Sequence, residues 1–315
     1  MARVWHSTAT ALAAASCIFA VSGCAPRPDS GQEPLKVLMI GNSFSISLLS
    51  QLPAVAHDCG KSLDLASLYI GGCSMEHHWR NIETAATNVA FRPYRFDRYV
   101  DGKAVAQAAK RNIQEVLESE RWDVVTVQQA SHFSWRPETY SPFGDNLVAY
   151  VRAHAPGAKV AVQETWSYTP WDKRLAGWKI TPDEMYRGLH AAYKAFADRH
   201  GLKVIPMGAA VQKWRESLPV KYTENSFGGD VVGGGRQAPR DHFKRAADNS
   251  WEPNCDVFHL NQRGEYLQAL VWTAFLFGPD SLDGLGYRPD FVSEDDVKLM
   301  KETAVSATRP AEFML

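Results

Sequence analysis

The chain has almost no net charge, no long internal repeat and no apolar run after its first residues that could span a bilayer. Its 315 residues include 34 basic and 35 acidic side chains, a formal net charge of −1 at pH 7. Nucleic-acid-binding domains usually carry a basic excess, so we expect no nucleic-acid partner. The apolar stretch at residues 267–277 reaches only the length of a buried helix, which predicts no transmembrane span there.

The first residues carry one apolar run that is too short to cross a membrane comfortably. Arg3 precedes the run at residues 9–21, and small residues then lead to Cys24. This order looks like a bacterial lipoprotein signal. We expect residues 1–23 to be a signal peptide, Cys24 to be the lipidated anchor and residues 24–34 to be a flexible tether. The protein would then be exported and lipid-anchored to a bacterial membrane, in the periplasm or at the outer membrane or cell surface. An ordinary secretory signal with an incidental cysteine is the alternative.

The rest of the chain alternates short apolar runs with helical stretches. Strands are predicted at residues 35–40, 63–70, 123–128, 159–164 and 203–207. Helices are predicted at residues 44–57, 104–119, 143–154, 182–200 and 266–277, with a polar connection at 94–103. This β-α-β rhythm predicts one α/β domain over residues 35–310, a three-layer αβα sandwich around a mostly parallel sheet.

A serine follows the first predicted strand, at the point where a helix would begin. Residues 35–45 read LKVLMIGNSFS, in which Gly41 and Asn42 supply a tight turn before Ser43. Open α/β sheets bind ligands at this edge, and backbone N–H groups there can receive a developing negative charge. Ser43 is therefore a candidate nucleophile, although a serine at a helix start can also be only an N-cap.

The far end of the chain offers the partners that a nucleophilic serine needs. Asp256 and His259 form a D-x-x-H pair just ahead of an apolar helical stretch. At this spacing Asp256 can orient His259 and stabilise its cation, and His259 can remove the proton of Ser43.

These blocks resemble the SGNH, or GDSL-like, hydrolases. GNSFS, the glycine after the second strand and the terminal D-x-x-H carry that resemblance, while GGCSMEHHW, VVTVQQAS, QETWSY and DVFHLN look like its DUF4886 branch. The resemblance covers roughly residues 35–278. It implies a flavodoxin-like αβα fold and a Ser-His-Asp esterase that works through an acyl-enzyme and needs no cofactor.

The resemblance also implies an oxyanion hole made by the backbone N–H groups of Ser43 and Gly72 and by a side-chain amide. The family usually places an asparagine in the third block, where this chain has Gln128 and Gln129. Alternation along a strand lets only one of them point into the site, and we choose Gln129 as the donor. The alternative is that both are ordinary polar residues at the edge of the sheet.

Further residues at the ends of the predicted strands are candidate substrate contacts: Asn42, His78, Gln128 and Trp166. Trp166 could equally be a packing residue. The adjacent His77 and His78 diverge on any regular element and lack a ligand at metal-binding spacing, so we expect no metal.

The expected substrate is an O-acetyl ester on a carbohydrate or polysaccharide, or another small ester. This expectation rests on the family resemblance, on the exported location and on ten tryptophans and eleven tyrosines whose rings suit sugar faces. Two alternatives stay open: a lipid or thioester acyl hydrolase, and an inactive glycan-binding lipoprotein.

Two features are harder to place. Cys73 and Cys255 flank predicted catalytic blocks, so we hypothesise a disulfide between them, with free thiols as the alternative. The glycine-rich, basic segment at residues 223–254 leads into Asp256. We expect it to be a loop insertion over or beside the active site that contacts a substrate carboxylate, or else a disordered surface insertion.

Overall fold

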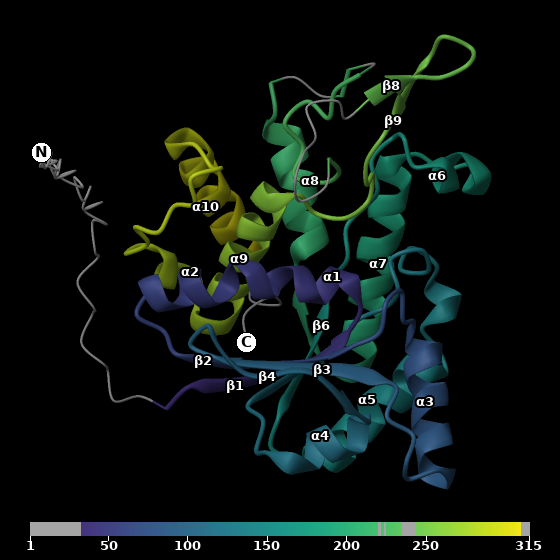
Figure 1. The fold of residues 1–315 in the computed structure, drawn as a ribbon, viewed down its shortest axis with the longest axis vertical. Helices are drawn as coiled ribbons and strands as arrows, with labels where there is room; N and C mark the ends of the chain where they lie inside the picture. Colours follow the sequence, from purple (N-terminus) through teal and green to yellow (C-terminus); the bar gives the residue numbers. More distant parts are fainter. Residues whose placement is uncertain (1–32, 220–221, 224, 235–242, 310–315) are drawn as a thin grey trace, which may run out of the picture. The chain divides into compact units, whose positions relative to one another are not determined.

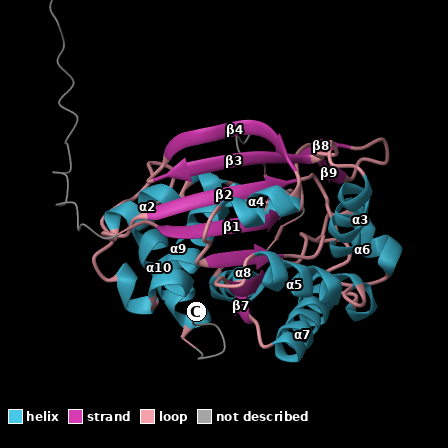
Figure 2. Ribbon diagram, turned by 90° about the horizontal axis from the view of Figure 1, so that it is seen from below, coloured by secondary structure: helices cyan, strands magenta, loops and turns pink. Residues whose placement is uncertain are grey.

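A seven-stranded sheet divides the helices of this protein into two layers (Figure 1). The computed structural model describes residues 33–219, 222–223, 225–234 and 243–309. The strand order is β4-β3-β2-β1-β5-β6-β7, and Figure 2 shows the twisted sheet with helices against it. The predicted three-layer α/β architecture with a mostly parallel sheet is confirmed. The expected signal peptide and Cys24 lie outside the described residues.

Five strands are parallel and form the core of the sheet: β1 (Leu35–Gly41), β2 (Leu63–Tyr69), β5 (Val124–Val127), β6 (Lys159–Gln163) and β7 (Lys203–Ile205). Strand β1 pairs with β2 on one side and with β5 on the other. Its residues from Val37 to Gly41 are buried, as a central parallel strand with both faces covered requires. Because these strands run in one direction, the loops that follow them gather at one edge of the sheet.

Ten α-helices are present in the described part of the chain: α1 (Ser43–Ile46), α2 (Leu52–Asp58), α3 (Met75–Thr87), α4 (Ile113–Ser119), α5 (Phe143–His154), α6 (Lys173–Trp178), α7 (Pro182–His200), α8 (Met207–Ser217), α9 (Gln262–Phe277) and α10 (Glu294–Thr308). Helices α1, α2 and α9 lie on one side of the sheet and α4 and α5 on the other (Figure 1). Helix α9 is buried from Gly264 to Leu276 between the sheet and its neighbours α8 and α10. None of the described helices is long and apolar enough to cross a membrane.

The helix predicted at residues 104–119 is wrong over most of its length. Strands β3 (Tyr94–Val100) and β4 (Lys103–Arg111) form an antiparallel hairpin that extends the sheet beyond β2. The turn consists of Asp101 and Gly102, with φ angles of 46° and 77°. Such a pair of left-handed residues matches the twist of a two-residue hairpin. The register of β4 shifts twice against β3, and Ala108 within it has a φ of 53°.

The helix predicted at residues 44–57 is interrupted. Helix α1 is followed by a 3-10 turn (Ser47–Ser50) before α2 begins. Pro53, at the start of α2, has no backbone N–H to continue the hydrogen bonds of the preceding turn, so the chain restarts there.

The predicted disulfide between Cys73 and Cys255 is also wrong. Cys73 and Cys255 are not joined by a disulfide. Cys73 is completely buried, and burial raises the pKa of its thiol well above the usual value, whereas Cys255 is partly exposed.

Replacing the hairpin glycine should weaken the fold. In Gly102→Ala the alanine would have to adopt a φ of 77°, a left-handed conformation that costs an L-residue about 1–2 kcal/mol. We expect a loss of this size in the free energy of unfolding, measured by urea denaturation, with Lys103→Ala as the neighbouring control. Equal stability of the two variants would contradict the left-handed turn.

Candidate active site

Ser43 is the first residue of α1 and follows directly on the turn after β1. Asn42 is the N-cap of this helix, because its Oδ1 accepts a hydrogen bond of 3.1 Å from the Phe44 N–H. Its Nδ2 donates to the Cys73 carbonyl at 3.0 Å and joins the loop after β1 to the loop after β2. The Ser43 hydroxyl therefore has no capping role. Asn42 itself is buried, so its predicted substrate contact is corrected to a structural one.

The three predicted catalytic side chains form one hydrogen-bonded chain. His259 Nε2 lies 2.8 Å from Ser43 Oγ, and His259 Nδ1 lies 2.6 Å from Asp256 Oδ2. All three residues are only partly buried, so solvent can reach the hydroxyl. Such a chain can move the serine proton to the imidazole while the carboxylate stabilises the resulting cation.

The Asp256 carboxylate is held in its ionised form. Its Oδ1 accepts two backbone hydrogen bonds, each of 2.8 Å, from Phe258 and His259. Partial burial by itself raises the pKa of Asp256, but the hydrogen bonds from the His259 ring and from these two amides outweigh it and bring the pKa below its usual value. The carboxylate is thus negative at neutral pH.

Every backbone carbonyl between Asp256 and His259 accepts a hydrogen bond. The outer two accept from the N–H groups of Gly234 and Gly233, at 2.9 and 2.8 Å. The inner two bond to Thr169 and Trp166: Thr169 donates its N–H and Oγ1 to Val257, and the indole of Trp166 donates to Phe258 at 2.9 Å. We call residues 256–259 the catalytic loop; its backbone is fixed from both sides.

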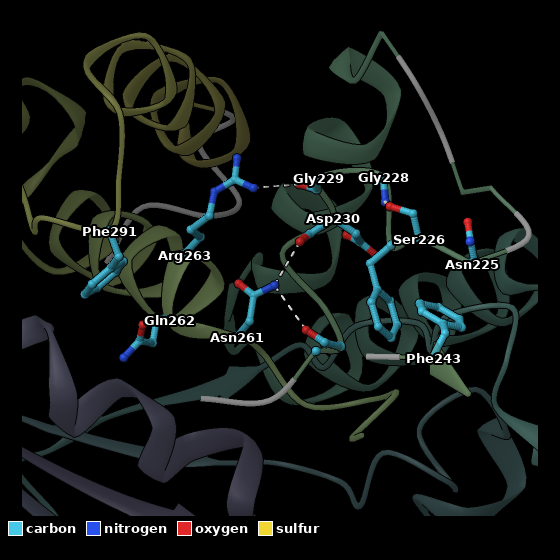
Figure 3. A pocket seen from close by; sticks show the side chains of 13 residues that line it. Asn225, Ser226, Gly228, Gly229, Asp230, Phe243, Asn261, Gln262, Arg263 and Phe291 are labelled. Atoms are coloured by element: carbon cyan, nitrogen blue, oxygen red, sulfur yellow. Dashed lines mark hydrogen bonds between the residues drawn. The ribbon is translucent and has the colours of Figure 1, made fainter. Parts of the chain in front are cut away.

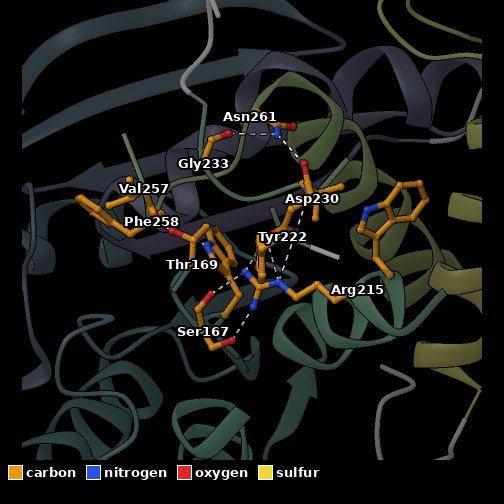
Figure 4. A network of polar contacts seen from close by, with 12 residues as sticks. Ser167, Thr169, Arg215, Tyr222, Asp230, Gly233, Val257, Phe258 and Asn261 are labelled. Atoms are coloured by element: carbon orange, nitrogen blue, oxygen red, sulfur yellow. Dashed lines mark hydrogen bonds and ion pairs between the residues drawn. The ribbon is translucent and has the colours of Figure 1, made fainter. Parts of the chain in front are cut away.

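A buried ion pair secures the segment that carries Gly233 and Gly234 (Figure 4). Arg215 on α8 and Asp230 are both almost completely buried, with 3.0 Å between Arg215 Nη2 and Asp230 Oδ2. Arg215 also donates to the hydroxyl and the carbonyl of Ser167, at 2.6 and 3.1 Å, and Tyr222 donates its hydroxyl to Asp230. The network connects α8, the loop after β6 and the segment beside the catalytic loop.

Trp166 is buried and therefore does not contact substrate as predicted; the packing alternative holds. Its ring stacks on Phe44 with centroids 4.1 Å apart, and Phe44 is the neighbour of the candidate nucleophile. Together with its bond to the Phe258 carbonyl, this contact couples the serine loop to the catalytic loop.

The two glutamines do not behave as predicted. Gln129 Nε2 donates to the carbonyl and the hydroxyl of Thr139, and its Oε1 accepts from the N–H groups of Met75 and Ala130. The Gln129 amide therefore joins three loop segments, and its Nε2 donors are used by Thr139. The choice of Gln129 for the oxyanion hole is corrected. Gln128 is also buried, beside Gly41, and neither polar atom of its amide has a partner among the described residues.

His78 is also corrected. It is completely buried, its Nδ1 lies 2.9 Å from the Tyr94 hydroxyl, and the two rings stack. Burial, with the neighbouring His77, lowers the pKa of His78 to about 3, so it is a neutral core histidine that substrate cannot reach. Among the described residues, no group of three or more histidine, cysteine, aspartate or glutamate side chains could hold a metal ion.

The predicted insertion at residues 223–254 is described only in part. Residues 230–234 lie directly beside the catalytic loop, and β8 (Phe243–Arg245) pairs with β9 (Trp251–Pro253) in a short hairpin. A contact between this segment and a substrate carboxylate stays a prediction.

A pocket of about 310 Å³ adjoins this segment (Figure 3). Residues 225–230 line one part of it and Asn261, Gln262 and Arg263 another. Neither Ser43 nor His259 contributes to its wall. Asn261, which does, donates its side-chain amide to the carbonyls of Asp230 and Gly233. The pocket therefore adjoins residues 256–259 without including the candidate catalytic side chains.

The chain belongs to the family described as the domain of unknown function DUF4886, whose sequence model matches residues 36–232. Asp256 and His259 lie beyond the matched residues. A crystal structure of a DUF4886 family protein from Bacteroides uniformis ATCC 8492 matches with a TM-score of 0.71 and 25% identity, over 90% of this chain and 98% of that chain. The predicted resemblance to this family is confirmed.

Two other solved structures match more weakly. A protein from Slackia heliotrinireducens, proposed to be an SGNH hydrolase, has a TM-score of 0.47 and 19% identity, over 76% of this chain and 98% of that chain. An acetyl xylan esterase has a TM-score of 0.45 and 13% identity, over 76% of this chain and 100% of that chain. Likeness at this level is too weak to assign an activity. Among the curated proteins, none matches this chain.

Breaking the buried ion pair should destabilise the fold strongly. Arg215→Met leaves the Asp230 carboxylate buried without its counter-charge, which typically costs about 3–5 kcal/mol. We expect a loss of this order in the free energy of unfolding, measured by urea denaturation. Adding Asp230→Asn should restore part of it, and a double variant no more stable than Arg215→Met would contradict this account.

The contribution of Asp256 to stability should depend on pH. Because its pKa is lower in the folded state, its ionised form stabilises the fold above the usual carboxyl pKa of 3.8, and this contribution is lost as the pH falls through the folded value. The difference in unfolding free energy between the wild type and Asp256→Asn should therefore shrink between pH 7 and pH 3. A difference that stays constant would show that the lowered pKa is not the cause.

Proposed function

We propose that this protein is a serine esterase of the SGNH type. The observation that carries the proposal is the hydrogen-bonded chain from Ser43 through His259 to Asp256, built at the carboxyl edge of the sheet from segments more than 200 residues apart. A histidine with only a structural role would not need a serine hydroxyl at Nε2 and a carboxylate at Nδ1.

The geometry supports the following sequence of steps. Ser43 Oγ attacks the ester carbonyl carbon while its proton passes to His259 Nε2, and Asp256 stays ionised and stabilises the imidazolium. The tetrahedral intermediate collapses when Nε2 returns the proton to the leaving alcohol, which leaves the acyl group on Ser43. A water molecule then gives a proton to Nε2 and attacks the acyl carbon. Nε2 returns that proton to Ser43 Oγ as the bond between Oγ and the acyl carbon breaks, which releases the acid and restores the free serine.

Two backbone donors are available for the oxyanion. The N–H groups of Ser43 and Gly72 form no hydrogen bond with the described residues. Gly72 follows β2, whose end pairs with the end of β1, and the bond from Asn42 to the Cys73 carbonyl keeps the two loops adjacent. Each such donor is typically worth about 3–4 kcal/mol of barrier.

The substrate we propose is an O-acetyl or other small acyl ester of a carbohydrate. Partly exposed aromatic rings close to the catalytic loop support it, because such rings suit the faces of sugars. Export and lipid anchoring through Cys24, which would bring the enzyme to extracellular glycans, are proposed on the N-terminal sequence alone.

The decisive experiment compares hydrolysis of p-nitrophenyl acetate by a soluble form that begins after Cys24 with its Ser43→Ala and His259→Ala variants. We expect both substitutions to lower kcat at least roughly 10³-fold, because Ser43→Ala removes the nucleophile and His259→Ala removes the group that transfers the proton. The matched control is Ser50→Ala, an exposed serine nearby on the same stretch of chain, which should hydrolyse the ester like the wild type. A wild type no faster than Ser43→Ala would refute the esterase.

A further inference from the structure

A row of aromatic rings leads away from the His259 imidazole. The Phe258 ring lies 4.1 Å from that of His259 and 5.5 Å from that of Tyr168. The row continues from Tyr168 to Trp178 at 6.0 Å and from Trp178 to Trp135 at 5.5 Å, all between ring centroids. Tyr168 is buried, whereas the other three rings of the row are partly exposed. We call Phe258, Tyr168, Trp178 and Trp135 the aromatic row.

Two guanidinium groups lie over the aromatic row. The Arg174 Cζ is 4.2 Å from the ring centre of Tyr168 and 4.3 Å from that of Phe258. The Arg136 Cζ is 4.8 Å from the nearest ring centre of Trp135 and 5.7 Å from that of Trp178. Cation–π attraction fixes both side chains there. One end of the row thus carries a positive charge only one ring away from the catalytic imidazole.

Both guanidinium groups keep donors that the fold does not use. Asp172 binds one edge of Arg174, accepting from Nε at 2.9 Å and from Nη2 at 2.5 Å. Nη1 of Arg174 has no partner in the part of the chain that the structure describes. The Arg136 side chain has neither a hydrogen bond nor an acidic partner among those same residues, so none of them neutralises its charge. Packing on the rings orders these groups without consuming their hydrogen bonds.

His132 is a titratable group whose pKa both arginines influence. It lies in the loop after β5, and burial followed by the charges of Arg174 and Arg136 lowers its pKa. At neutral pH it is uncharged and leaves the positive potential of the two arginines unchanged. The Arg174 charge also acts on Asp256, which places this arginine within electrostatic reach of the triad.

We propose that the aromatic row and its two arginines form a subsite for an acidic sugar, and that the acyl ester hydrolysed at Ser43 is carried by a uronic acid. This inference rests on the esterase proposed above. The partly exposed indoles would contact the face of the sugar ring. A carboxylate is the group that a planar, pre-oriented guanidinium binds best, through paired charge-assisted hydrogen bonds. A neutral sugar would offer the Arg136 guanidinium no negative group to bind.

The test uses two esters that differ only at one carbon: acetylated methyl glucuronide and acetylated methyl glucoside. We expect the wild type to prefer the glucuronide by on the order of 10-fold or more in kcat/KM, mainly through a lower KM, as one charged hydrogen bond would give. Arg136→Gln should bring the ratio of the two kcat/KM values close to one. Arg136→Lys, which keeps the charge without the planar fork, should leave an intermediate ratio, and Arg174→Gln should also lower it.

Arg121→Gln is the matched control, because Arg121 is an exposed arginine just before β5, at the opposite edge of the sheet. It removes the same charge and should leave the ratio at the wild-type value. Equal rates on both sugars by a wild type whose activity depends on Ser43 would overturn the acidic subsite and leave the esterase standing.

Binding without turnover separates the two proposals. Methyl glucuronide should change the tryptophan fluorescence of Ser43→Ala at lower concentrations than methyl glucoside does, and adding Arg136→Gln should abolish this difference. This result would support the subsite even if no ester were hydrolysed. Equal binding of both sugars to Ser43→Ala would overturn it.

Discussion

The hydrogen bonds that fix the backbone of the catalytic loop are the constraint on which the rest of the site depends. The loop reaches the serine from the far end of the chain and belongs to no strand of the main sheet. Residues 230–234 act in place of a neighbouring strand on one side, and Thr169 and Trp166 hold the other. The buried Arg215–Asp230 ion pair links residues 230–234 to helix α8. The 2.8 Å contact between Ser43 and His259 therefore depends on residues outside the Ser43-His259-Asp256 chain.

Local patterns predicted most of the fold. The first strand, predicted at residues 35–40, is β1 with one residue added, and the turn before Ser43 lies where the glycine and asparagine place it. The prediction failed at β4, because its alanines favour a helix and their pairing with β3 is a tertiary effect that no helical or alternating pattern shows. The Asp101–Gly102 turn was the available signal. Helix α4, which does follow, begins at Ile113, and its N-cap Asn112 forms a capping box with Glu115.

The candidate site divides in the same way. Residue spacing, together with the family resemblance, placed Ser43, Asp256 and His259 in one predicted site, and these side chains do form one hydrogen-bonded chain. It could not tell which way Gln129, His78 and Trp166 point, since each is buried by segments distant in the chain. Trp166 packs in the core against Phe44. The side chains of Asn42 and Gln129 form hydrogen bonds to neighbouring loops.

The two edge strands of the sheet, β4 and β7, affect how readily this protein associates with other chains. Exposed strand edges invite other chains to pair with them, which leads to aggregation. At one edge, the register shifts and the left-handed Ala108 bend β4, and Lys103, Lys110 and Arg111 place like charges along it. At the other, β7 is only three residues long. An incoming strand would meet a bent, charged edge at β4 and only three residues to pair with at β7, so both edges of the sheet disfavour pairing with another chain.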